Sequence, residues 1–186
     1  MANGTLKVSN IQTSSGSGTI TIGQSGETVT IASGATQTGI GGANTPAFAA
    51  YNTGDYTMSD ATYTTSQINT EFFDTASAFD TSTYKFTPQT AGKYYFYGSF
   101  RGGHSDNNCI NSAAIRLRKN ESSSIAFTRF TSDVSSSNPK GYNMSISGAI
   151  ELNGSTDYVT LETYLDMVSQ TPTVYDAYFG GYKIIE

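Results

Sequence analysis

The aromatic residues of this chain are confined to one part of it. All 23 of them, thirteen Tyr and ten Phe with no Trp, lie from Phe48 onward, and residues 1–44 contain none. Those 44 residues also carry only two charged side chains, Lys7 and Glu27. A segment so poor in bulky side chains cannot bury a core of its own. The sequence therefore predicts two parts: a Ser/Thr/Gly-rich segment over residues 1–44 and a domain over residues 45–186.

The composition favours β-structure throughout. Only 13% of the residues are charged, against roughly a quarter in a typical globular protein. Thr, Tyr and Phe suit pleated, half-buried surfaces, and no helical periodicity is evident. We expect an all-β fold, with nine or ten antiparallel strands packed as a β-sandwich in residues 45–186. The strand-like runs are 47–51, 68–73, 84–87, 93–101, 110–119, 125–130, 142–152, 158–165 and 175–185.

The N-terminal segment repeats a short alternating pattern. Polar and aliphatic residues alternate in Thr5–Val8, Thr19–Ile22 and Thr28–Ile31, with Gly/Ser-rich turns between them. One interpretation is a disordered linker, which the Gly/Ser content supports. The interpretation we favour is a trimeric β-stalk, because these steps are strand formers and three chains could bury what one cannot. The residues expected to pack around the common axis are Ile20, Ile22, Val29 and Ile31.

Two strand-like runs in the domain are aromatic on both faces. In the run 94–100, Tyr94, Phe96 and Phe100 point to one side of a strand, and Tyr95 and Tyr97 point to the other. The last run, 177–185, has the same two-sided character. One face would fill the sandwich core and the other would meet a neighbouring subunit, although an incidental exposed row is the alternative. The predicted interface residues are Tyr95, Tyr97, Tyr178, Phe179 and Tyr182.

Net charge and hydropathy exclude several partners. A formal net charge of −5 does not give the electropositive surface that nucleic-acid or anionic-membrane binding needs. The first residues lack the pattern of a secretory signal, and no run approaches the length of a membrane span. We therefore expect no nucleic-acid partner and no membrane insertion.

The residues that usually carry chemistry are sparse. Cys109 is the single cysteine and His104 the single histidine, and they lie five positions apart in a predicted loop. Cys109 is expected to be a small buried side chain at the start of a strand. Asp106, with Asn107 and Asn108, could supply oxygen ligands to calcium, but a polar turn is the favoured interpretation. With no catalytic motif, the sequence predicts a protein that is not an enzyme and binds no cofactor or metal.

Several blocks of the domain resemble a known family. In order, they are Pro46–Tyr51, Phe79–Pro88 leading into Ala91–Phe96, Leu117–Asn120, Ser147–Leu152, Asp157–Leu161 and Phe179–Tyr182. Together they are similar to the complement-type globular head, the TNF-like jelly roll, over nearly all of residues 46–186. The resemblance implies a ten-stranded jelly roll assembled as a homotrimer. The family usually carries this head on a stalk, which here is not collagen because no Gly-X-Y period occurs.

The N-terminal repeats resemble the β-rich stalks and anchors of bacteriophage virion proteins, which often end in such heads. The two resemblances together indicate a virion structural protein, made in the host cytoplasm and placed on the virion surface. We expect a head fibre or decoration protein whose residues 1–44 contact capsid or tail proteins, with Leu6 and Val8 adding to a capsid sheet. Alternatives are a tail-fibre tip adhesin and a non-viral lectin-like module. Loops at the far end of the head could contact a host glycan or protein.

Overall fold

The computed structural model describes residues 11–12, 19–35, 44–106, 109–132 and 139–184. Contacts within the chain separate Met1–Ile40 from Gly41–Glu186, and each part is described by itself. The anchor residues predicted from the sequence, Leu6 and Val8, lie outside the described residues. The described part of Met1–Ile40 contains no strand, whereas Gly41–Glu186 forms a β-sandwich, the head.

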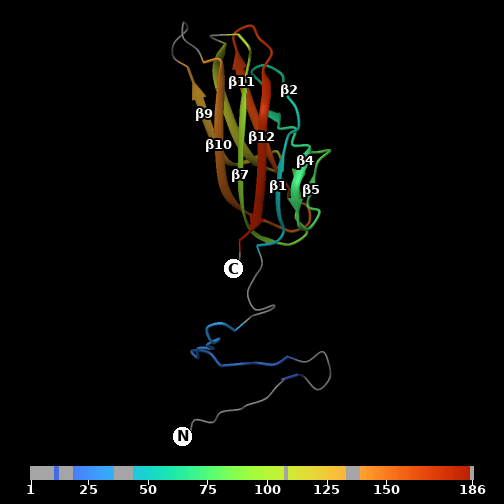
Figure 1. The fold of residues 1–186 in the computed structure, drawn as a ribbon, viewed down its shortest axis with the longest axis vertical. Coiled ribbons are helices and arrows are strands. Elements are labelled where there is room, and N and C mark those ends of the chain that lie inside the picture. Colours follow the sequence, from blue (N-terminus) through green and yellow to red (C-terminus); the bar gives the residue numbers. More distant parts are fainter. Residues whose placement is uncertain (1–10, 13–18, 36–43, 107–108, 133–138, 185–186) are drawn as a thin grey trace. The chain divides into compact units, whose positions relative to one another are not determined.

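Two six-stranded antiparallel sheets make up the head (Figure 1). In sheet I the order is β10-β7-β12-β1-β4, with β2 paired to β12; in sheet II it is β5-β6-β11-β8-β9, with β3 paired to β11. Strands that are neighbours in space are therefore often distant in sequence. The strand bounds are β1 Ala47–Tyr51, β2 Tyr56–Thr57, β3 Thr64–Thr65, β4 Thr70–Asp74, β5 Phe79–Asp80, β6 Lys85–Phe86, β7 Gly92–Gly103, β8 Ile110–Lys119, β9 Ser123–Thr131, β10 Gly141–Leu152, β11 Val159–Met167 and β12 Thr173–Lys183.

The predicted all-β fold is confirmed, while the strand count is corrected. Each of the nine runs predicted from the sequence overlaps a strand, and β1 and β8 have the predicted bounds. The described residues form twelve strands where about ten were expected. The three unpredicted strands, β2, β3 and β5, have two residues each. A two-residue strand has no alternating pattern to detect, because it exists only through pairing with a longer strand.

Aromatic rings from both sheets fill one end of the core. Phe86 is fully buried and stacks on Phe48, with 4.5 Å between their ring centroids. It also meets Phe96 edge-on at 5.6 Å and Tyr94 at 5.8 Å. Phe179 packs against Phe48 at 4.9 Å in the same cluster. Such offset and edge-on pairs contribute stability beyond the area they bury, so this cluster positions β1, β7 and β12 within sheet I.

Two of the three alternating runs of the N-terminal segment lie in the part that the structure describes, and neither is a strand there. The runs Thr19–Ile22 and Thr28–Ile31 are unpaired on either side of a turn. In that turn the Glu27 amide donates to the Gln24 carbonyl at 3.0 Å, and the Glu27 carboxylate accepts from the Gln24 amide at 2.7 Å. An isolated pair of four-residue strands is marginal in water, so strands in this segment would need partners from other copies, and the predicted stalk stays a prediction.

A carboxylate fixes the connection between β10 and β11. Asp157 accepts hydrogen bonds from Asn120 Nδ2 at 2.8 Å and the Asn153 amide at 2.9 Å, and it pairs with Lys119 Nζ at 2.7 Å. The Lys119 ammonium first, and then the Asn120 amide, lower the pKa of Asp157 from its usual value. The ionised carboxylate therefore stabilises the folded head.

We predict that this carboxylate makes the head sensitive to acid. Because its pKa is lower in the folded than in the unfolded state, its contribution is complete above the unfolded pKa near 3.8 and is lost as pH falls through the folded pKa. Asp157→Asn should cost about 1–3 kcal/mol at neutral pH, as expected for hydrogen bonds to a charged group. Urea unfolding of the wild type and the variant at pH 7 and at pH 3 measures the free energy of unfolding that the substitution removes at each pH. An equal loss for this variant at the two pH values would contradict the assignment.

Candidate functional site: an exposed aromatic face

The outer face of sheet I carries rows of aromatic side chains set by the strand register. Tyr95 of β7 lies opposite Tyr182 of β12. One row along, Tyr97 lies opposite Gly180, and in the next row Tyr178 of β12 lies between Ser99 of β7 and Tyr51 of β1. Residues two apart on a strand share a face, so all of these side chains project from the same surface.

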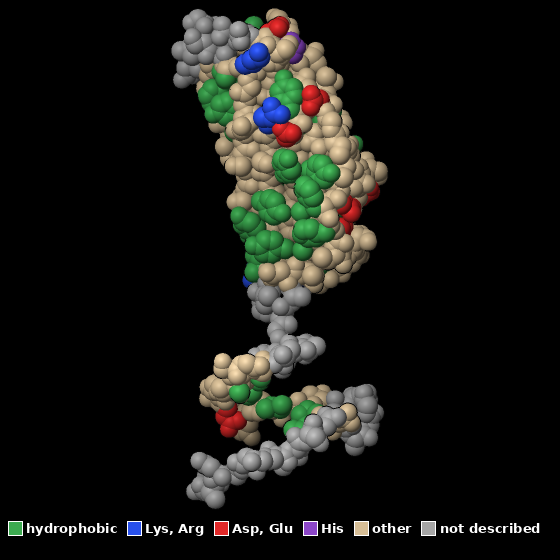
Figure 2. All heavy atoms as spheres, viewed as in Figure 1, with side chains coloured by type: hydrophobic (Ala, Val, Ile, Leu, Met, Phe, Trp, Pro, Cys, Tyr) green, Lys and Arg blue, Asp and Glu red, His purple; other side chains and the backbone are tan. Residues whose placement is uncertain are grey.

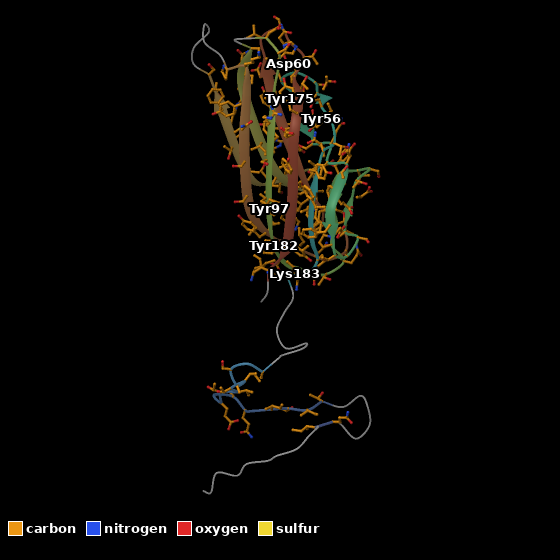
Figure 3. The ribbon with its side chains drawn as sticks, viewed as in Figure 1. Tyr56, Asp60, Tyr97, Tyr175, Tyr182 and Lys183 are labelled. Atoms are coloured by element: carbon orange, nitrogen blue, oxygen red, sulfur yellow. The ribbon has the colours of Figure 1, made fainter. Side chains whose placement is uncertain are left out.

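The rings on this face contact one another and remain accessible. Centroid distances are 5.6 Å for Tyr95–Tyr182, 6.4 Å for Tyr51–Tyr178 and 4.4 Å for the stacked pair Tyr51–Phe72. Tyr97 and Tyr178 are about two-fifths exposed. Figure 2 shows these hydrophobic side chains gathered over β7, β12 and β1, and Figure 3 places Tyr97 and Tyr182 together near Lys183. The aromatic face is defined here as Tyr51, Phe72, Phe73, Tyr95, Tyr97, Tyr178 and Tyr182.

Gly180 allows the Tyr97 ring to lie across the neighbouring strand. A Cβ at Gly180 would come within 2.4 Å of the Tyr97 ring, so the ring occupies the space that a larger residue would fill. Burial against the sheet and, secondarily, the nearby Tyr182 hydroxyl raise the pKa of Tyr97. The Tyr97 hydroxyl therefore stays protonated at neutral pH and can donate a hydrogen bond to a partner.

An irregularity in β4 adds two phenylalanines to the face. The pairing of β1 with β4 shifts between Ala49 and Ala50, because Ala49 lies opposite Phe73 while Ala50 lies opposite Glu71. Phe72 is the extra residue of this β-bulge, which turns two successive side chains outward. Phe72 is 63% exposed and Phe73 is 50% exposed.

Four of the five predicted interface residues lie on this face, and one does not. Tyr95, Tyr97, Tyr178 and Tyr182 project outward, as just described. Phe179 is corrected: it alternates inward with its strand, is 1% exposed and belongs to the aromatic core. The sequence interpretation did not include Tyr51, Phe72 and Phe73. Tyr51 could have been found from the alternation of β1, since Phe48 and Ala50 are the buried positions, but the bulge leaves no signal in the sequence.

The other end of the same sheet face is polar. Arg101 Nε pairs with Asp176 Oδ2 at 2.6 Å, and the Arg101 guanidinium lies 4.9 Å from the Tyr175 ring centroid. An open hollow of about 420 Å³ adjoins this pair and reaches Tyr178. An aromatic area rich in hydroxyls beside a charged rim is the composition of a protein–protein contact. The hollow is lined by Ser99, Phe100, Arg101, Asn143, Met144, Ser145, Asp176 and Tyr178.

The remaining candidate residues are placed as follows. Cys109 is buried directly before β8, as expected, with its thiol 3.3 Å from the Asp106 carbonyl oxygen. His104 Nδ1 accepts from the Asp106 amide at 3.1 Å, and Asn107 and Asn108 lie outside the described residues. The described ranges hold no group of three or more metal-ligating side chains. In the same ranges, no helix has the length and apolar character needed to cross a membrane.

The predicted stalk residues are exposed in the single chain. The exposed fractions are 42% for Ile20, 69% for Ile22, 53% for Val29 and 40% for Ile31. Every residue of 19–35 is exposed, so no side chain within that range covers them. Their packing around a common axis therefore stays a prediction.

Comparison with known proteins identifies the fold of the head. The globular domain of zebrafish complement 1qA protein is 22% identical, covers 75% of this chain and 96% of its own, and has a TM-score of 0.57. The Eiger TNF from S. frugiperda is 14% identical, covers 75% of this chain and 93% of its own, and has a TM-score of 0.54. The head thus has the TNF-like jelly-roll fold. No protein-family model and no curated protein matches the sequence.

Proposed function

We propose that the chain is a homotrimer whose heads associate through the aromatic face. The observation that supports this proposal is the set of exposed rings on sheet I, which a single chain leaves in contact with water. Contiguous apolar surface of this kind is typical of association sites, and Tyr is favoured there because its ring is buried while its hydroxyl finds a partner. With one cysteine in the sequence, an intrachain disulfide cannot stabilise the head, so subunit contacts are the expected source of additional stability.

The N-terminal segment supports the same oligomer. Its aliphatic side chains, Ile20, Ile22, Val29 and Ile31, are exposed in the single chain and alternate with Thr. Three such segments side by side would cover these side chains and supply the strand partners that one chain lacks. Residues 1–44 would then form a slender trimeric β-stalk, on which the heads are displayed.

We propose a structural role for this trimer on a bacteriophage particle, as a head fibre or decoration protein. Support comes from the combination of a jelly-roll head with a Ser/Thr/Gly-rich β-forming segment, which resembles virion stalks and anchors. The polar–apolar alternation of Thr5–Val8 suits addition of a strand to a capsid sheet. A tail-fibre tip is the alternative site on the particle.

Deleting residues 2–12 tests the anchor separately from the trimer. We expect the truncated protein to assemble into trimers as before, because the aromatic face is intact, but to be absent from purified particles. Immunoblots of particles measure incorporation, and gel filtration with light scattering measures the oligomer. A matched control deletes four residues from Ser14–Gly18 and should retain incorporation. Particles that still carry the truncated protein would contradict anchoring by this segment.

A further inference from the structure

The outer face of sheet II carries a second group of aromatic and charged side chains. This face points away from the aromatic face of sheet I, because the two sheets pack their inner sides together. An inference about it therefore does not depend on the proposed trimer or virion role. The arginine–aromatic cluster is defined here as Tyr63, Arg116, Phe127, Arg129, Glu162 and Tyr164.

Strand register brings this cluster together in two rows. In the first, Arg116 of β8 lies between Glu162 of β11 and Phe127 of β9. In the second, Ala114 lies between Tyr164 and Arg129. The small Ala114 side chain is fully buried, since its larger neighbours cover it, and the Arg129 guanidinium reaches to 5.2 Å from the Tyr164 ring centroid.

A buried ion pair holds the first row in place. Arg116 donates to Glu162 Oε2 at 2.6 Å, and Glu162 is 6% exposed. The Arg116 guanidinium also lies 3.7 Å from the centroid of the Tyr63 ring, which in turn is 4.8 Å from the Tyr164 ring. These contacts fix two half-buried tyrosine rings on the surface. Phe127, beside them, is 52% exposed.

Arg129 differs from the other arginines in the described part of the chain. Arg101 pairs with Asp176, and Arg116 and Arg118 both lie within 4 Å of Glu162. Arg129 has no carboxylate within that distance among the described residues, and it donates a hydrogen bond to the Ser112 hydroxyl at 3.1 Å. It is exposed, so its remaining donors can bind an anionic group in a charge-assisted hydrogen bond.

We propose that the arginine–aromatic cluster binds an acidic carbohydrate. The apolar C–H face of a sugar ring would pack on the exposed Phe127 ring and on Tyr164, and a carboxylate on the sugar would meet the Arg129 guanidinium. Asp166 lies in the row of paired residues next to that of Arg129, and its Oδ1 accepts a hydrogen bond from Asn111 Nδ2 at 3.2 Å. Its carboxylate can also accept a hydrogen bond from a sugar hydroxyl. Nucleic-acid binding rests on contacts to several phosphates, whereas this cluster offers one guanidinium without a carboxylate partner among the described residues. A peptide would more commonly pair with backbone groups at a sheet edge.

Binding of full-length protein to immobilised glycans tests the proposal. The probes are polygalacturonic acid and polysialic acid, with methyl-esterified polygalacturonate as the matched uncharged sugar and polyglutamate as an acidic peptide. We expect retention on at least one acidic glycan and none on the ester or the peptide. Arg129→Gln and Phe127→Ser should each weaken that binding roughly 10-fold or more, as expected for loss of a charge-assisted hydrogen bond or a stacked ring.

Controls separate this site from general charge and from folding. Lys140→Gln removes one positive charge outside the cluster and should leave binding unchanged, while Arg129→Lys should bind between wild type and Arg129→Gln. Circular dichroism checks that each variant is folded. The proposal is overturned if neither acidic glycan is retained, if the ester binds as well as the acid, or if polyglutamate binds as tightly. It is equally overturned if Arg129→Gln binds like wild type.

Discussion

Replacing Tyr97 and Tyr178 together by Glu is expected to convert the proposed trimer into folded single chains. Both rings lie in the middle of the aromatic face, two-fifths exposed in the single chain, and would be buried on assembly. Loss of a central aromatic contact typically costs 2 kcal/mol or more, or roughly 30-fold in affinity for each site. Glutamate adds the cost of placing unpaired charges in the contact. Gel filtration with light scattering at several protein concentrations measures the change.

The matched control places the same charge outside the aromatic face. Val168 is 47% exposed and lies in the turn after β11. Val168→Glu should remain trimeric, and the double variant should keep the circular dichroism of the wild-type head because neither ring belongs to the core. A double variant that is still trimeric would show that association uses another surface.

Phe86→Ala is expected to have the largest effect on stability. Phe86 is fully buried and contacts Phe48, Tyr94 and Phe96 from across the sandwich. Removing a buried phenylalanine leaves a cavity and typically costs about 3–5 kcal/mol. For a chain of this size that corresponds to a fall in melting temperature on the order of 10 °C. Thermal unfolding, followed by circular dichroism at one fixed protein concentration, measures it.

Phe127→Ala is the matched control, because it removes the same atoms from a side chain that is half exposed. We expect it to change stability by well under half as much as Phe86→Ala, since little apolar surface is returned to water. Equal losses for the two variants would contradict the burial of Phe86 in the core.

Most of what could be predicted from the sequence came from the alternation of inward- and outward-facing side chains along single strands. In β7 it correctly separated Tyr94, Phe96 and Phe100 from Tyr95 and Tyr97, since side chains on a strand take opposite faces in turn. It failed for Phe179, which was grouped with Tyr178 and Tyr182 although it alternates with them. The three residues were treated as one aromatic run. Whether a residue holds an odd or an even position on the strand decides which face its side chain takes, and of these three only Phe179 reaches the core.

Features that arise from pairing between strands far apart along the chain could not be predicted from the sequence. The bulge that exposes both Phe72 and Phe73 arises only where β4 pairs with β1. Likewise, the arginine–aromatic cluster joins Tyr63 to residues of β8, β9 and β11, which lie far from it along the chain. In the described part of the N-terminal segment the alternating runs are unpaired in a single chain, because a strand forms only where a partner strand is present, so the predicted stalk stays untested.

Native mass spectrometry of the full-length protein tests most directly the claim that three copies share the aromatic face. We expect one dominant species with three times the 19.8 kDa mass of a single chain. Dilution should leave that species intact, and the Tyr97→Glu, Tyr178→Glu variant should abolish it. A wild-type protein that is monomeric at micromolar concentration would contradict the claim.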